Sequence, residues 1–333
     1  MSRPWSIFYV FLSLALLVLA FVLSLLYGTR TLSFEAALTL FGYEDADPLE
    51  TTILTTSRLP RSLIAAGVGS GLGVAGAIHQ TVTRNLLADP GLLGINSGAA
   101  YAVVLTTAVW NSAPPLLVLG SAATFGAAAS GVMVLILAGG ARSSHGNALR
   151  LILAGAVTAI LLGAATQFLF LFEPGAFEAS QAWLAGSFAD RPQNLISIFL
   201  PLLVAFLILG ILIAQPMQLL MISEVQGRAL GADIAKLRLL ALAIAAVICG
   251  FAVSLAGPIA FVGLIAPHVT RWLAGPTPLP LFIGSSIFGA TFALFADVVS
   301  RLAVAPAELP VGLSIAFFGV PFYLVLLRSW RLR

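Results

Sequence analysis

Side chains able to do chemistry are scarce in this sequence, and their spacing argues against catalysis. The three histidines, His79, His145 and His268, lie far apart and lack the spacing and acidic companions of a metal site. The single cysteine, Cys249, has no partner for an intramolecular disulfide and suits a small buried apolar position. No paired acid and base or activated nucleophile is present, so the sequence predicts neither an enzyme nor a metal site.

A glycine-rich stretch is the next candidate, because glycine loops can bind phosphates. It contains Gly67, Gly69, Gly71, Gly73 and Gly76. No Gly-Lys-Ser/Thr follows these glycines, no strand precedes them, and no Walker A sequence occurs elsewhere in the chain. The Gly67-x-x-x-Gly71 spacing instead predicts the close approach of two helices. Any ATP site that the function requires would therefore lie on another subunit.

The chain that positions these residues is far more apolar than a soluble domain. Only 9% of its 333 residues are charged, and 60% are hydrophobic. Its charge-free runs repeatedly reach the roughly 20 residues that a helix needs to cross the hydrocarbon core. Residues 111–115 divide the long 90–141 run, and Gly257-Pro258 breaks the 239–270 run. We therefore predict an all-α polytopic membrane protein that forms a single domain over residues 1–333.

Ten spans are predicted, of which the eighth is short and interrupted and must be buried among its neighbours. Their ranges are 5–27, 62–82, 92–110, 116–138, 151–172, 193–213, 239–256, 258–273, 279–298 and 309–327. The first apolar run is longer than that of a typical signal peptide, and no small-residue cleavage site follows it. We therefore expect it to be a retained span.

The basic residues set the expected orientation. Ten spans place both termini on one side, and that side receives eleven of the sixteen arginines and lysines. Nine of the thirteen acidic residues lie on the other side. We therefore expect a multi-pass protein with both termini in the cytoplasm. The basic residues are scattered, so membrane lipid is an expected partner and nucleic acid is not.

Four segments at the span ends carry the clearest motifs. They are Arg58-Leu59-Pro60-Arg61, the 83–98 segment TRNLLADPGLLGINSG, the 257–268 segment GPIAFVGLIAPH, and Glu308-Leu309-Pro310-Val311-Gly312 with Gly319-Val320-Pro321-Phe322. In this order and spacing they resemble the FecCD-type permease family, the membrane subunits of ATP-binding-cassette (ABC) importers for ferric siderophores, haem and cobalamin. The resemblance runs from about residue 55 to the C-terminus, with Leu86 where the family usually has proline.

The resemblance implies the ABC importer type II permease fold, whose ten spans agree with the predicted number. It also implies a second permease subunit, identical or paralogous, with the pathway along the interface. Two cytoplasmic ABC ATPases and an extracytoplasmic substrate-binding protein would complete the assembly. ATP and Mg²⁺ would bind the ATPases, so no cofactor is expected in this chain. The implied location is the bacterial cytoplasmic (inner) membrane.

Three arginines, Arg58, Arg61 and Arg301, are expected near the outer ends of spans, on a side that is otherwise acidic. The resemblance implies that they receive glutamates of the binding protein. A local alternative is interfacial snorkelling or pairing within the chain, for example between Asp297 and Arg301 at i,i+4.

Two cytoplasmic segments are candidates for contact with the ATPases and for gating. Residues 217–238 alternate polar and apolar side chains, and Gly231 is expected to stop a short helix. The resemblance makes this the coupling segment, with contacts from Glu224, Arg228, Leu230 and Gly231; an ordinary loop is the alternative. In the 142–150 turn it places the cytoplasmic gate at Asn147 and Ala148.

The spans that the resemblance places along the pathway are the fifth and the tenth. Polar residues inside a span usually face the bundle interior, which is either helix packing or a pathway. The residues chosen as pathway lining are Thr158, Thr166, Gln167, Phe168 and Ser314.

The function that the sequence supports best is the permease subunit of an importer for a ferric siderophore or similar metal chelate. Haem and cobalamin are alternative cargoes. A stand-alone secondary transporter is a further alternative, but no carboxylate stands alone in the middle of a predicted span.

Overall fold

The computed structural model of the chain describes residues 7–42, 47–110, 114–139, 147–221, 226–227 and 231–330. Within these ranges the chain forms helices and no strands, which confirms the predicted all-α class.

A helix occupies each of the ten predicted span ranges, with its ends shifted by a few residues. These helices are α1 (Ile7–Leu26), α4 (Leu59–Thr83), α5 (Ile95–Val109), α6 (Leu116–Leu137), α7 (Asn147–Phe172), α9 (Gln193–Leu212), α12 (Ile234–Ala256), α13 (Val262–Ala274), α14 (Pro278–Leu302) and α15 (Val311–Trp330). Shorter elements join them: α2 (Phe34–Leu38), η1 (Thr39–Phe41), α3 (Pro48–Ile53), η2 (Leu54–Arg58), η3 (Pro90–Leu93), α8 (Pro174–Leu184), α10 (Ala214–Met217) and η4 (Gln218–Leu220).

Seven helical stretches among the described residues are long and apolar enough to cross a membrane by length and composition. Helices α5 and α15 contribute shorter apolar stretches, Ile95–Val109 and Val311–Leu326. Helix α13 has only 13 residues, which is too few for a complete crossing. The protein is thus a multi-pass membrane protein, and the number of ten spans stays a prediction.

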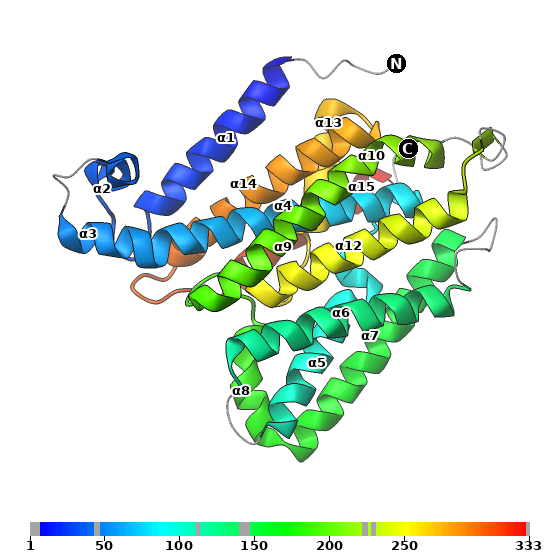
Figure 1. The fold of residues 1–333 in the computed structure, drawn as a ribbon, viewed down its shortest axis with the longest axis horizontal. Helices are drawn as coiled ribbons and strands as arrows, with labels where there is room; N and C mark the ends of the chain where they lie inside the picture. The colour runs from blue at the N-terminus through cyan, green and yellow to red at the C-terminus, as the bar shows by residue number, and fades with distance from the viewer. Residues whose placement is uncertain are drawn as a thin grey trace.

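Helix α4 is the central element of the bundle. It packs against α14, α12, α13 and α9. Figure 1 shows α1 at one edge of the molecule and α5, α6, α7 and α8 grouped at the opposite edge, with α4, α9, α12 and α14 between them. We call the two ends of the bundle the Arg61 end and the Arg84 end, after residues at the start and just past the end of α4.

Glycines allow α4 to lie unusually close to its neighbours. A Cβ at Gly69 would clash with the backbone carbonyl of Gly289 in α14, and one at Gly73 with that of Ser285. The predicted Gly67-x-x-x-Gly71 motif does a different job, because Gly67 and Gly71 receive leucine side chains from α9. The backbones therefore approach each other at Gly69 and Gly73, two positions along from the motif that the spacing suggested.

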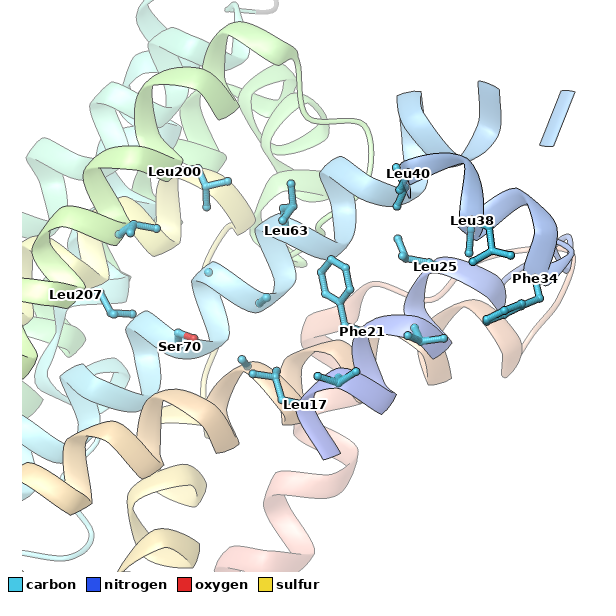
Figure 2. A pocket seen from close by; sticks show the side chains of 17 residues that line it. Leu17, Phe21, Leu25, Phe34, Leu38, Leu40, Leu63, Ser70, Leu200 and Leu207 are labelled. Atoms are coloured by element: carbon cyan, nitrogen blue, oxygen red, sulfur yellow. The ribbon is translucent and has the colours of Figure 1, made fainter. Parts of the chain in front are cut away.

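An apolar groove of about 680 Å³ separates α1 and α2 from α4 and α9 (Figure 2). Leu17 and Phe21 of α1 face it from one side, and Leu207 of α9 faces it from the other. Among the described residues that line it, Ser70 alone has a polar side chain, and its hydroxyl already donates to the Ser286 carbonyl at 3.2 Å. Because water would find almost no partner there, the groove suits acyl chains and not a polar cargo.

The close packing of α4 on α14 predicts different effects for the same substitution at two glycines. Gly73→Ala should destabilise the protein by about 1–3 kcal/mol, because the new methyl group meets the backbone of α14. Gly163→Ala in α7 is the matched control, since a Cβ there meets no atom of the described chain within 4 Å. Thermal unfolding in detergent measures both. Equal midpoints for the two variants would contradict the packing described here.

Candidate functional site

A buried cluster of charges lies at the Arg61 end, where α4 meets α14. The Nε and Nη2 atoms of Arg61 each lie 2.9 Å from Oδ1 of Asp297. Nη1 of Arg61 donates to Oε2 of Glu308 at 2.6 Å. The Asp297 side chain is fully buried, whereas that of Glu308 is 34% exposed. Arg61 thus bridges one inaccessible carboxylate and one accessible carboxylate.

Arg301 joins the same cluster from the next turn of α14. Its Nη2 lies 2.9 Å from Oδ2 of Asp297, which is the i,i+4 pair expected from the sequence. The guanidinium also donates to the carbonyl and hydroxyl of Ser24, at 3.0 and 2.9 Å. The Ser24 hydroxyl lies 2.7 Å from that of Ser62. Arg301 therefore ties α1 to α14 through a buried hydrogen-bond network.

Arg58 binds the chain by a different route. Its Nη1 donates to the Tyr27 carbonyl at 2.5 Å, and its Nη2 donates to the Arg30 carbonyl at 2.9 Å. The guanidinium fills the space next to Gly28 that any larger side chain would need. Arg58 thus closes the end of α1 onto the start of α4.

The structure therefore brings the three predicted docking arginines together at the Arg61 end, but their side chains are buried and paired within the chain. Arg58, Arg61 and Arg301 are 5%, 8% and 1% exposed. Pairing within the chain, the alternative drawn from the sequence, is present in the structure, while docking stays a prediction. The link from Arg61 to Asp297 spans 236 positions and that to Glu308 spans 247, so neither pair was identified from the sequence.

A second polar centre fixes the interrupted span between α12 and α13. Oδ2 of Asp89 accepts the Phe261 N–H at 3.1 Å, and Oδ1 accepts the Gly91 N–H at 3.0 Å. The side-chain amide of Asn96 donates to the Ile259 carbonyl at 3.2 Å. Asp89 is 5% exposed. The 84–94 connection and the first turn of α5 thus supply hydrogen bonds that the broken helix lacks.

The place of Asp89 along the bundle is set by α13. A Cβ at Gly263 would lie 3.1 Å from the Leu72 carbonyl in the middle of α4 and 3.3 Å from Oδ1 of Asp89. The carboxylate therefore lies level with the interior of α4, well inside the bundle. Sequence analysis missed this, since it placed Asp89 between the predicted spans 62–82 and 92–110 and assigned it no contact. The Asp-Pro-Gly triplet does carry a local signal, because aspartate often accepts from the N–H two residues on.

The other face of the interrupted span packs against α8, which the sequence analysis did not identify. Gly257 has φ +78°, and a Cβ there would clash with the Trp183 carbonyl. The Ser187 N–H donates to the Ala256 carbonyl at 2.8 Å. Pro174 at the first turn of α8 is a favourable helix start that could have indicated it.

Three of the four predicted coupling residues lie outside the described residues. These are Glu224, Arg228 and Leu230, and the turn before α7 (residues 142–146) also lies outside. Gly231 is exposed and has φ +82°, a conformation that glycine adopts without strain. Nearby, the Arg84 guanidinium donates twice to the Leu220 carbonyl, at 3.1 and 2.6 Å. This contact joins the end of α4 to the start of the predicted coupling segment.

Helix α7 begins at Asn147, so both predicted gate positions, Asn147 and Ala148, lie in its first turn at the Arg84 end. The structure describes the helical backbone at these two positions and not their side chains.

The predicted pathway residues divide into two groups. Gln167 and Phe168 are exposed on α7, and the Phe168 ring lies 4.5 Å from that of Phe172. Thr158, Thr166 and Ser314 are buried at 0%, 8% and 5% exposure. Thr158 packs against Gly94, and the Thr166 hydroxyl donates to the Leu162 carbonyl at 2.8 Å. Only the first group faces outward from this subunit.

Two of the three histidines have packing roles. Nδ1 of His79 lies 2.8 Å from the Ala75 carbonyl in its own helix. The His268 ring packs edge-on against Trp272 and Phe322, with centroids 4.6 and 5.7 Å apart. His145 is outside the described ranges.

Comparison with known proteins places these features in context. The sequence model of the FecCD transport family matches residues 16–329. The ferric enterobactin permease FepD of Escherichia coli is 36% identical, over 86% of this chain and 85% of its own. The hemin permease HmuU of Yersinia pestis is 37% identical over 86% and 85%. A solved metal-chelate type ABC transporter in an inward-facing conformation superposes with a TM-score of 0.83 at 28% identity, covering 96% of this chain and 98% of its own.

The two-sided hydrogen bonding of Asp89 predicts a loss of stability on a nearly isosteric change. Asp89→Asn leaves one acceptor for two buried N–H groups and should cost about 1–3 kcal/mol. Asp47→Asn is the matched control, because Asp47 caps α3 through one oxygen at an exposed site and asparagine caps equally well. Thermal unfolding in detergent should separate the two variants. An unchanged midpoint for Asp89→Asn would contradict the anchoring role.

Proposed function

Because the chain belongs to the FecCD transport family, we propose that it is the transmembrane permease subunit of an ABC importer for a ferric siderophore or a similar metal chelate. Relatives named for ferric enterobactin and Fe(3+) dicitrate transport support an iron chelate as the cargo. Haem and cobalamin are the alternative cargoes. The chain is a transport component and not an enzyme, and ATP with Mg²⁺ would bind a separate ATPase subunit.

One observation favours this function over a stand-alone carrier: the buried carboxylates already have permanent partners. A proton- or sodium-coupled carrier needs an intramembrane group that changes its charge or its ligands during the cycle. Asp297 contacts two guanidinium groups, and Asp89 accepts from two backbone N–H groups. Neither is available to bind and release an ion, which supports a transporter that receives its energy from partner subunits.

The proposed orientation places the Arg61 end outside and both termini in the cytoplasm of a bacterial cell, with the protein in its inner membrane. The outward end would receive the substrate-binding protein at the cluster of Arg58, Arg61 and Arg301. Charge supports this, because three arginines face only two carboxylates, Asp297 and Glu308, and one positive charge is left over. Electrostatic attraction of this kind sets register and association rate more than affinity.

The Arg84 end would engage two ABC ATPases through the 217–238 segment, with Glu224, Arg228, Leu230 and Gly231 in contact. Asn147 and Ala148, in the first turn of α7, would form the cytoplasmic gate. Helix α7 also exposes an apolar face, including Leu153, Ile160 and Leu171. A second permease subunit covering that face would enclose Gln167 and Phe168 along a shared pathway.

Uptake into lipid vesicles separates the importer from the stand-alone carrier. Vesicles that hold this chain with its ATPase should accumulate a ferric siderophore when supplied with ATP and the binding protein. Vesicles that hold the chain alone should accumulate none. An ATPase that lacks its Walker A lysine is the matched control and should abolish uptake. Full uptake by the chain alone would contradict the proposed function.

The coupling role of Gly231 can be tested through its backbone conformation. Gly231→Val places a β-branched residue at φ +82° and should reduce ATPase co-purification and uptake by at least about tenfold. Gly231→Asn is the control and should retain both, since asparagine tolerates this conformation. Both variants should insert normally, because the position is exposed and lies outside the helices. Equal ATPase co-purification and uptake in both variants would show that Gly231 is not part of the ATPase contact.

A further inference from the structure

Glu308 differs from every other member of the charged cluster in its accessibility. Its side chain is 34% exposed, whereas those of Arg61, Arg301 and Asp297 are 9%, 1% and 0% exposed. Among the described residues it makes one ion pair, with Nη1 of Arg61 at 2.6 Å. Asp297, by contrast, is held between Arg61 and Arg301. Of the two carboxylates on Arg61, Glu308 is therefore the one that an incoming group can reach and replace.

Glu308 also lies in the connection between α14 and α15, three residues before α15 begins. The next residue, Leu309, donates its N–H to the Ser300 carbonyl at 3.0 Å, and α15 begins at Val311. Helix α15 packs on α14 and α13. Its exposed side chains include Leu313, Phe317 and Leu324. The start of α15 is also held by the buried Val311 and by Gly312, which packs directly against the Ala185 carbonyl. The Arg61–Glu308 ion pair adds the contact that attaches this start to α4.

We propose that Glu308 is an exchangeable counter-ion: a carboxylate of the docking protein takes its place on Arg61 and thereby frees the start of α15 from its attachment to α4. The partner is an acidic side chain on the extracytoplasmic binding protein, so this inference rests on the proposed function. Docking would then act directly on one helix of the permease, in addition to holding the two proteins together.

Exchange avoids the largest electrostatic cost of opening a buried ion pair. Removing one partner leaves a buried charge without compensation, which typically costs about 3–5 kcal/mol. When an incoming carboxylate replaces Glu308, Arg61 remains paired with two carboxylates throughout, one of them Asp297. The displaced Glu308 carboxylate moves into water, where it is well solvated. It is then free to move together with α15.

The net charge of the cluster also favours an acidic side chain of the binding protein over a basic one. Its three guanidinium groups and two carboxylates leave one positive charge in excess. A side chain of the binding protein cannot displace Asp297, since the Asp297 side chain is fully buried. The excess charge attracts the carboxylate, and the exposed edge at Glu308 determines where it binds.

Glu308→Gln tests the exchange, because it removes the competing charge while keeping the size of the side chain. In vesicles with the ATPase, the variant should associate with the binding protein at least about threefold faster at low salt. This difference should shrink toward 1 M salt, where the screening length falls to about 3 Å. Hydrolysis of ATP without the binding protein should rise toward the stimulated rate. Glu178→Gln, an exposed change on α8, is the matched control and should behave as wild type.

Release of α15 can be observed directly with a fluorescent label on Ala307→Cys, an exposed position. The native Cys249 is fully buried and should not react with the label. Binding protein should change the signal of the otherwise wild-type chain, and Glu308→Gln should show the changed signal before any binding protein is added. Glu308→Asp, which shortens the reach of the carboxylate, should shift it in the same direction by less and provides the test if Glu308→Gln fails to fold.

Two outcomes distinguish this inference from the function on which it rests. If the wild-type assembly transports and Glu308 variants match Glu178→Gln in association rate, hydrolysis and label signal, the exchange is wrong and the importer function stands. If the wild-type assembly shows no response of ATP hydrolysis to a binding protein, the proposed function itself fails.

Discussion

A bilayer interior provides no hydrogen-bond partner for a backbone group, and this constraint governs the protein wherever a helix is interrupted. The clearest case is the segment between α12 and α13, where Gly257 turns the chain and Phe261 has φ +66°. The groups freed by this break are bonded by Asp89 and Ser187, from two distant connections, and by Asn96 in the first turn of α5. Parts of the 84–94 connection and of the segment after α8 are therefore drawn into the bundle, where Asp89 and Phe188 are buried.

Buried charge follows the same logic at the Arg61 end. A guanidinium taken out of water must keep its hydrogen bonds, and here each of the three arginines is bonded to carboxylates, carbonyls or a hydroxyl of the chain. Because Arg301 reaches Ser24 and Arg58 reaches Tyr27, these bonds also attach α1, whose remaining packing leaves an open apolar groove (Figure 2). The cluster thus stabilises the peripheral helix as well as concentrating charge.

Sequence patterns predicted what depends on local composition and left out what depends on distant contacts. Charge-free runs located a helix in every expected range, and the i,i+4 spacing identified the pair of Asp297 with Arg301. Asp89 and Phe261 are 172 positions apart, so no local pattern could join them. The same holds for Arg61 with Glu308. The roles of Glu224, Arg228 and Leu230 remain predictions, since these residues lie outside the described ranges.

The backbone contacts at Gly69 and Gly73 have a mechanical consequence. Between Gly69 and Gly73, about one turn of α4, the backbones of α4 and α14 touch with no side chain between them to absorb displacement, so the two helices are stiffly joined there and act as one beam. One end of this beam holds the arginine cluster, and at the other Arg84 grips the Leu220 carbonyl. A push at either end therefore tilts the whole beam, as a lever does.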